Sequence, residues 1–258
     1  MSKLHFKPVM VATLLLGGTL AAQASIVTVL PSDASWGSTG NGGGGSSAIT
    51  GAVPHLGNGS IELHGDRTRY QKAAADLGLL NDVSSLTFDW SIAIGSTSSL
   101  GADYTPALRL LIVDLGQFSE LIWEGAYNGT YGNTTKGQWY SSGANDLFHR
   151  WVTGVGETQD AGAQVTLSIE DWADNASSGG NQWYSDTARV YAISVGVGSS
   201  VGSGYQAYAD NVTYATSAGS TSYNFEVRAA AAVPEPASMF LVGLALGGAA
   251  FASRRTRR

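Results

Sequence analysis

The stretch Ser84-Ser-Leu-Thr-Phe-Asp-Trp-Ser-Ile-Ala-Ile94 carries the clearest structural pattern in the chain. Its large apolar residues recur at every second position, and most of the residues between them are serine, threonine or aspartate; the apolar set is Leu86, Phe88, Trp90, Ile92 and Ile94. Because successive side chains of a strand point to opposite faces, this alternation predicts a strand with one face in a core and the other toward water.

Similar short runs follow at close spacing on both sides of this strand, and clusters of Gly, Ser, Asn and Asp separate them. This spacing is typical of a sandwich or barrel rather than of βαβ units. We therefore predict an all-β chain, a single jelly-roll-like antiparallel β-sandwich. The predicted strands are 25–30, 60–64, 107–115, 119–127, 137–141, 147–153, 164–169, 188–197, 205–216 and 222–228.

Three segments of the central region depart from the strand pattern. The Ala-rich centre of Arg69 to Leu80 predicts a helix, and Ser168 to Asp174 predicts one helical turn with Ser168 at its N-cap. The stretch Gly37 to Ser47 consists almost entirely of glycine and serine and is predicted to be flexible.

The two ends of the 258-residue chain read as targeting segments. Lys3 and Lys7 precede an apolar run and then Ala22-Gln-Ala24, the order of a secretory signal peptide that signal peptidase removes after Ala24. We thus divide the chain into a signal peptide, residues 1–24, a β-sandwich domain, residues 25–228, and a C-terminal segment, residues 229–258.

The charge of the chain excludes some classes of partner. All twenty acidic but only eight basic residues lie between Asp33 and Glu235, a net charge of −12 for that range. Nucleic acids and anionic lipids attract basic surfaces, so we expect neither nucleic-acid binding nor binding to an anionic membrane surface. The absence of cysteine means that no disulfide stabilises this exported chain.

No residue pattern identifies a catalytic site, and we expect a protein that is not an enzyme. The alternative is a polysaccharide-active hydrolase or lyase that uses acids such as Glu120, Glu124 or Asp114. Four residues of extended chain span about 13 Å, whereas glycosidases hold their two carboxyl groups about 5–9.5 Å apart. Glu120 and Glu124 would therefore need a bulge, or partners from neighbouring strands.

Asp210 alternates with Tyr208, Val212 and Tyr214 on one face of a predicted strand. A carboxylate buried on that face must meet a cation, an arginine or several backbone donors. A structural calcium ion, with Asp33 or Glu62 as a second ligand, is one of these alternatives; we expect no other cofactor.

Carbohydrate binding has a physical rationale in the aromatic residues of the Gly-, Ser- and Asn-rich segments. Sugars stack their apolar faces on exposed rings, and loops are the usual place for such rings. Packing of the same rings against the rim of the sandwich is the competing interpretation. The candidate platform residues are Trp139, Tyr140, Trp172, Trp183 and Tyr184.

The last segment contains Pro234-Glu235-Pro236, then a mostly apolar run from Ala237 to Ala252, then Arg254, Arg255, Arg257 and Arg258. As a helix the apolar run would span about 24 Å, enough to cross a membrane with local thinning. The arginines would stop transfer and keep the end of the chain on the cytoplasmic side.

This order of elements resembles the PEP-CTERM sorting signal of Gram-negative bacteria. The resemblance implies recognition by exosortase at Pro234, Glu235 and Pro236, a temporary membrane-spanning intermediate in the inner membrane, and delivery to the cell surface or extracellular matrix. It implies nothing about catalysis, because the signal is attached to many unrelated domains.

The central region resembles, more loosely, extracellular bacterial sandwiches of the jelly-roll or concanavalin-like type. The resemblance rests on Leu86-Thr-Phe-Asp-Trp90, Pro106-Ala-Leu-Arg-Leu110, Leu121-Ile-Trp-Glu-Gly125 and Tyr208-Ala-Asp-Asn-Val-Thr-Tyr214. In carbohydrate-binding modules of this shape a late Asp-Asn-Val strand often contributes to a calcium site, which implies such a role for Asp210. Together these observations predict an exported, non-enzymatic module that interacts with exopolysaccharide or the cell envelope.

Overall fold

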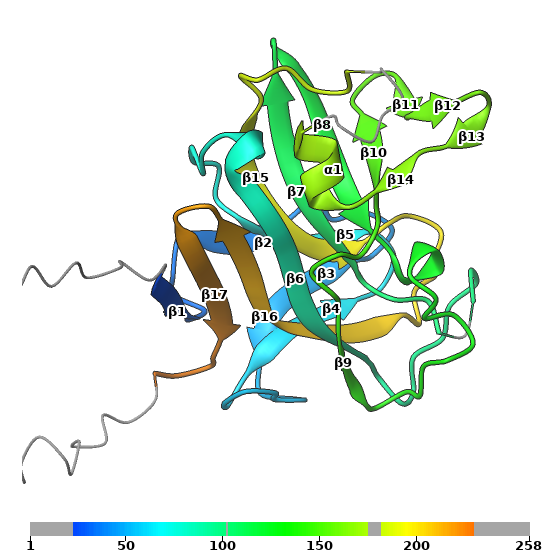
Figure 1. Cartoon of the computed structure of the whole chain (residues 1–258). Coiled ribbons are helices and arrows are strands. Elements are labelled where there is room, and N and C mark those ends of the chain that lie inside the picture. The colour runs from blue at the N-terminus through cyan, green and yellow to red at the C-terminus, as the bar shows by residue number, and fades with distance from the viewer. Residues whose placement is uncertain (1–22, 102, 175–181, 230–258) are drawn as a thin grey trace, which may run out of the picture.

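A computed structural model describes residues 23–101, 103–174 and 182–229 of the chain (Figure 1). Its strands form two large sheets and one small hairpin. The seven-stranded sheet contains β1 (Gln23–Val29), β17 (Gly219–Phe225), β16 (Gln206–Thr216), β4 (Ser60–His64), β3 (Ser46–Thr50), β6 (Val83–Ile92) and β9 (Trp139–Ser141).

The eight-stranded sheet is made mostly of strands from the middle of the chain. Its order is β11 (Gly156–Glu157), β10 (Phe148–Val152), β8 (Gln117–Trp123), β7 (Ala107–Asp114), β15 (Arg189–Val197), β5 (Thr68–Lys72) and β2 (Trp36–Thr39), with β14 (Thr166–Leu167) beside β10. A separate hairpin joins β12 (Gln159–Asp160) to β13 (Ala163–Gln164). The helices are η1 (Leu80–Asp82), η2 (Gly125–Tyr127) and α1 (Ile169–Asp174).

Nearly all the ladders are antiparallel, as predicted. Within the described ranges the exception is β1, which pairs in parallel with β17 at the left edge of the molecule in Figure 1. β1 begins at Gln23, so the predicted cleavage after Ala24 falls inside this strand.

The core lies between the inner faces of the two large sheets. Phe88 and Trp90 of β6 reach across to Trp123 of β8, with ring centroids 5.1 and 6.2 Å apart. α1 adds Ile169 and Trp172 to the same core. These contacts confirm that four of the five apolar residues of the stretch quoted above face the core. The strand ends at Ile92, so the fifth, Ile94, is 82% exposed. Asp89 and Ser91, which were predicted to face water, are buried on the opposite face.

Two local predictions from composition are wrong. Residues 69–72 lie in β5 rather than in a helix, because Thr68 and Tyr70 are buried and the strand pairs with both β15 and β2. Tertiary pairing thus overrides the helix propensity of the alanines that follow. The Gly-rich stretch is also structured, since its two ends form β2 and β3 and its middle turns through positive φ at Gly43 and Gly44.

The predicted turn of helix at Ser168 to Asp174 is confirmed as α1. The Ser168 hydroxyl accepts a hydrogen bond from the Asp171 backbone N–H at 3.1 Å and donates to the Asp171 carboxylate at 2.8 Å. This N-cap satisfies a backbone donor that the short helix leaves free.

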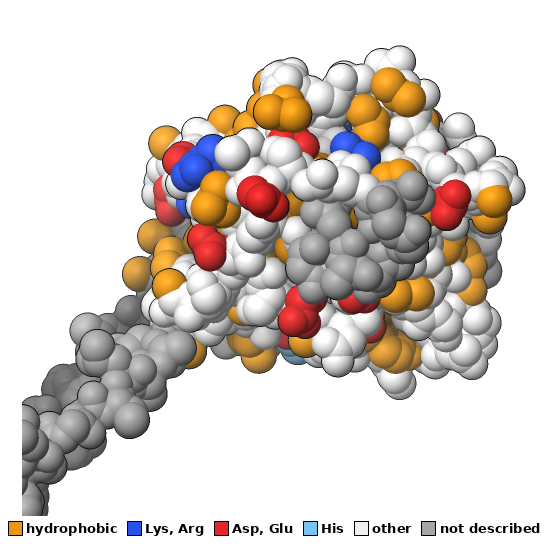
Figure 2. Space-filling model, turned by 45° about the horizontal axis from the view of Figure 1, so that its top comes forward, with side chains coloured by type: hydrophobic (Ala, Val, Ile, Leu, Met, Phe, Trp, Pro, Cys, Tyr) orange, Lys and Arg blue, Asp and Glu red, His pale blue; other side chains and the backbone are white. Residues whose placement is uncertain are grey.

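None of the helices in the described part of the chain is long and apolar enough to cross a membrane. The predicted membrane-spanning segment, Ala237 to Ala252, lies outside the described residues. Neutral and apolar atoms make up most of the face in Figure 2 that is not drawn in grey, and acidic and basic groups lie among them.

Candidate functional site

The outer face of the eight-stranded sheet carries a group of charged side chains in contact with one another. The alternation of side chains along each strand determines which residues lie on this outer face. Phe148 of β10 and Leu110 of β7 point into the core, so the residues next to them in sequence point outward. We call this surface the charged face; its residues are Arg69, Arg109, Phe118, Glu120, Glu124, His149 and Trp151.

Glu120 is the acceptor of this group. Its two carboxylate oxygens accept hydrogen bonds from Nη1 and Nη2 of Arg69 at 2.6 and 3.1 Å. Arg109 approaches the same carboxylate less closely, with Nε 3.5 Å from Oε2. The two-pronged pair with Arg69 has the geometry of a strong ion pair, and it fixes the position of Glu120 on the sheet.

Burial shifts the proton affinities of the groups around this pair. It lowers the pKa of Arg109 to about 10, helped by the nearby charge of Arg69. Burial also lowers the pKa of His149 to about 4, with Arg109 as the next cause, so His149 is neutral at pH 7. The pKa of Glu124 is raised by burial, against the opposing effect of Arg109. Perturbed groups gathered in one place are typical of functional sites.

Aromatic rings lie beside these charges. Trp151 is directly opposite Glu120 in the β8–β10 ladder and is 47% exposed. Phe118, two residues before Glu120 on the same face, is 48% exposed and packs edge-to-face on Tyr191 with centroids 5.5 Å apart. The charged face thus offers open aromatic surface next to fixed hydrogen-bonding groups.

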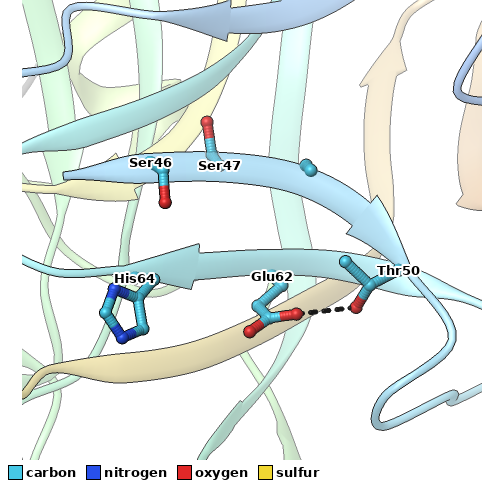
Figure 3. A pocket seen from close by; sticks show the side chains of 6 residues that line it. Ser46, Ser47, Thr50, Glu62 and His64 are labelled. Carbon is cyan, nitrogen blue, oxygen red and sulfur yellow. Dashed lines mark hydrogen bonds between the residues drawn. The ribbon is translucent and has the colours of Figure 1, made fainter.

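A second candidate is a shallow pocket of about 230 Å³ on the outer face of the seven-stranded sheet (Figure 3). Glu62 accepts hydrogen bonds from Thr50 Oγ1 at 2.9 Å and Gln206 Nε2 at 2.8 Å. His64 and Ser46 lie beside Glu62 in the picture, whereas Ser47 points away. Because its central carboxylate is already bonded to two neighbours, this pocket offers fewer free groups than the charged face.

The predicted carbohydrate platform does not form one surface. Trp172 and Tyr184 are fully buried, so the prediction that they belong to a platform is wrong. The Trp172 indole N–H donates a hydrogen bond to the Phe148 carbonyl at 2.9 Å. Trp183 is half-buried against Trp172, with centroids 5.9 Å apart. These rings pack at the end of the sandwich beside α1. This arrangement agrees with the competing interpretation, in which the rings pack against the rim of the sandwich.

The other two predicted platform residues are half-buried on β9. Tyr140 stacks on Trp90 of the core at 4.9 Å. Trp139 stacks on His55 at 4.2 Å, and His55 Nε2 is 2.9 Å from Asp89 Oδ2. Trp139 is the only one of the five to lie on an outer face, beside polar side chains of the seven-stranded sheet.

Asp210 is fully buried and its carboxylate is occupied by backbone donors. Oδ1 accepts from the N–H groups of Asn211 and Phe225 at 2.8 and 2.9 Å, and Oδ2 accepts from Leu56 N–H at 3.3 Å. Of the three alternatives for a buried carboxylate, the structure shows several backbone donors. Asn211 has a positive φ of 50°, and the ladder with β6 shifts register there, so the alternation along β16 is broken.

The predicted second ligands of a calcium ion lie elsewhere. Asp33 accepts from the Ser35 N–H at 2.8 Å, and Glu62 belongs to the pocket described above. Among the described residues, no three His, Asp or Glu side chains gather in a group that could hold a metal. Calcium at Asp210 therefore stays a prediction for experiment.

Among the acids of the enzymatic alternative, Asp114 has a structural contact. Its carboxylate accepts hydrogen bonds from the backbone N–H and the hydroxyl of Ser185. Glu120 lies in β8, but Glu124 follows the end of this strand in an extended conformation, so the two do not share one strand as predicted. Arg69, Arg109 and Trp151 were missed by sequence reasoning. The alternation of β10 around Phe148 is the signal that could have identified Trp151.

The sorting residues Pro234, Glu235, Pro236, Arg254, Arg255, Arg257 and Arg258 lie outside the described residues. Residues 232–258 match the model of the PEP-CTERM protein-sorting motif, which confirms the resemblance. The motif implies an exported protein that exosortase processes at the cell envelope. No curated protein matches the chain.

Comparison with solved structures finds β-sandwich proteins at low similarity. They include a carbohydrate-binding module of the β-sandwich superfamily (11% identity, TM-score 0.36), the family 11 carbohydrate-binding module from Clostridium thermocellum (10%, 0.33) and a family 12 xyloglucanase from Bacillus licheniformis (13%, 0.36). Each match covers 70% of this chain and, in the same order, 56%, 88% and 100% of the other. The first match thus spans little more than half of that protein.

Proposed function

We propose that this chain is a non-catalytic polysaccharide-binding module, delivered to the cell surface or extracellular matrix of a Gram-negative bacterium. One observation carries the proposal: the half-exposed ring of Trp151 lies opposite Glu120, which Arg69 holds in place. An open ring can stack on the apolar face of a sugar, and fixed charged groups can bind its hydroxyls.

The contacts of the acids support binding rather than catalysis. Both oxygens of Glu120 are used by Arg69, and the carboxylate of Asp114 is used by Ser185. A nucleophile or general base must be free to approach the substrate, and these two carboxylates would first have to break strong contacts.

The route to the surface follows from the sorting motif together with the predicted signal peptide. Signal peptidase would release the N-terminus, and the apolar run before the arginines would hold the chain in the inner membrane. Exosortase would then process it at or near Pro234-Glu235-Pro236. The tail anchors the protein only until that step.

The binding proposal is tested with the full chain, purified in a detergent without a sugar headgroup, on an array of bacterial and plant polysaccharides. We expect Trp151→Ala to weaken binding about tenfold, which corresponds to about 1.4 kcal/mol. Trp139→Ala, on the other sheet, is the matched control and should bind as the wild type does. Equal binding by wild type and Trp151→Ala would refute the assignment of the charged face.

A hydrolase is the second candidate, because burial raises the pKa of Glu124. A carboxyl group with a raised pKa is typical of the general acid of glycoside hydrolysis. Its partner would have to come from a neighbouring strand, since β8 has no bulge to bring Glu120 closer. Release of reducing ends from a bound polysaccharide, lost in Glu124→Gln, would support this candidate over simple binding.

A further inference from the structure

Arg109 is the least satisfied charged group on the charged face. Its side chain is only 4% exposed, and neither Nε nor Nη1 has a hydrogen-bond partner. Glu120 Oε2 is 3.5 Å from Nε, beyond the usual 2.7–3.2 Å of an N–H···O hydrogen bond. The structure therefore contains a buried guanidinium whose Nε and Nη1 groups have no hydrogen-bond acceptor.

The neighbouring acids do not supply the missing acceptor. Glu120 gives both oxygens to Arg69. Glu124 forms no ion pair with Arg109 within 4 Å in the described part of the chain, and burial raises its pKa. His149 is neutral at pH 7 because burial lowers its pKa to about 4. Two guanidinium groups thus share one carboxylate.

An arginine in this position lowers the stability of the fold unless an acceptor pairs with its free N–H groups. A buried polar group without a partner destabilises a fold, and a buried charge does so more strongly. Leu111 and Ile122, the neighbours of Arg109 on the same face, show that apolar side chains fill this surface well. The surrounding domain is strongly acidic, and yet both oxygens of the nearest ion-pairing carboxylate are used by the other arginine.

We infer that Arg109 binds the carboxylate of an acidic sugar, so that the polysaccharide of the proposed function is one that contains hexuronic acid. The inference rests on the proposed function and names its ligand class. A carboxylate is planar and presents two oxygens, which match the fork of a guanidinium. The inference assigns the anionic group of the ligand to Arg109 and its apolar face to Trp151.

The spacing of these two residues fits one continuous ligand. Arg109 and Trp151 lie on the same face with β8 between them, because Arg109 is opposite Ile122 and Trp151 is opposite Glu120. From strand spacing and rise, their α-carbons are about 12 Å apart, a distance that a short oligosaccharide can bridge. Tyr104 lies near Arg109 and its ring faces Tyr131 at 6.2 Å, so aromatic surface also flanks the arginine.

The experiment compares polygalacturonate with its methyl ester, a neutral polymer of the same sugar, and with dextran sulfate. Binding of the full chain is measured by affinity electrophoresis at about 0.15 M salt, which screens the repulsion between the acidic chain and an anionic polymer. We expect wild type to bind polygalacturonate at least tenfold more tightly than the ester. Arg109→Met should abolish this preference and still bind the ester.

Two further variants control for fold and charge. Arg109→Lys keeps the positive charge but loses the two parallel N–H donors of the guanidinium. We expect this variant to retain only part of the preference for polygalacturonate over its ester. Arg189→Gln removes an exposed arginine that pairs with Asp76 and should change nothing. Replacing a buried charge by an apolar side chain is commonly neutral or stabilising, so Arg109→Met should unfold as cooperatively as wild type in urea.

The outcomes separate this inference from the proposed function. Equal binding of polygalacturonate and ester by wild type, or an unchanged preference in Arg109→Met, would overturn the acidic-sugar inference alone. Tighter binding of dextran sulfate would overturn the assignment to a carboxylate. Failure of wild type to bind the three polymers, with binding to another polysaccharide on the array, would overturn the acidic-sugar inference alone. Failure to bind the three polymers and every polysaccharide on the array would overturn both.

Discussion

The buried carboxylate of Asp210 makes the stability of the fold depend on pH in an unusual direction. Burial raises its pKa from an ordinary 3.8 to about 6, although three backbone N–H groups partly oppose the shift. The folded chain therefore holds the proton of Asp210 more tightly than the unfolded chain does. Replacement by asparagine removes this titration and keeps the size of the side chain.

The sign of the effect follows from this difference in proton binding. A raised folded pKa means that the contribution of Asp210 to the free energy of unfolding is present below pH 4 and is lost as pH rises to 6. A shift of about 2 units, at about 1.4 kcal/mol each, amounts to about 3 kcal/mol in full. Between pH 4 and pH 7 most of it, about 2–3 kcal/mol, should disappear.

The assay is urea unfolding of the full chain, followed by tryptophan fluorescence at pH 4 and pH 7. The free energy of unfolding of wild type, minus that of Asp210→Asn, should be about 2–3 kcal/mol larger at pH 4 than at pH 7. Subtracting the variant cancels the titration of the other acids. Asp160→Asn, in the exposed β12–β13 hairpin, is the control and should show no such difference.

Two results would refute this reasoning. One is a difference between wild type and variant that is the same at both pH values. The other is a difference that grows as pH rises, which is the sign expected for an ionised carboxylate held by calcium. The backbone contacts also predict that EDTA leaves the unfolding curves unchanged, whereas the calcium prediction requires a loss of stability.

Three other predictions follow from burial, capping and sorting. Trp172→Ala should lower the free energy of unfolding by about 3–5 kcal/mol in urea, because the ring is fully buried and its loss leaves a cavity; a change below 1 kcal/mol would contradict its place in the core. Ser168→Ala should cost about 1 kcal/mol by removing the N-cap of α1, and Ser168→Asp should not. The intact mass of the exported protein should lack the residues after the Pro-Glu-Pro motif, and a full-length C-terminus would contradict processing.

The sequence predicts the fold where alternation is strong. β4 is predicted at its observed bounds, and β6 is recognised from its alternating apolar residues, four of which lie within the observed strand. α1 is predicted because a cap and a helical turn are local features. β5 was missed because its stability comes from pairing with β15 and β2, which are distant in the sequence.

The candidate site is harder to predict, since it depends on which face of a strand is outward and on what covers it. Trp172 and Tyr184 lie in segments whose composition suggests loops, yet they pack against the core. Trp151 is on a strand whose residues Phe-His-Arg-Trp-Val offer aromatic or charged groups to both faces. The unsatisfied state of Arg109 depends on the competition of Arg69 for Glu120, which only the packed sheet reveals.

The central claim is that the charged face of the eight-stranded sheet binds polysaccharide through Trp151. It is tested most directly by NMR of the tryptophan indole N–H signals of the full chain during titration with an oligosaccharide of galacturonic acid. We predict a saturable shift of the Trp151 signal and no shift of the buried Trp172 signal. A shift of Trp139 without Trp151 would place binding on the other sheet and contradict the claim.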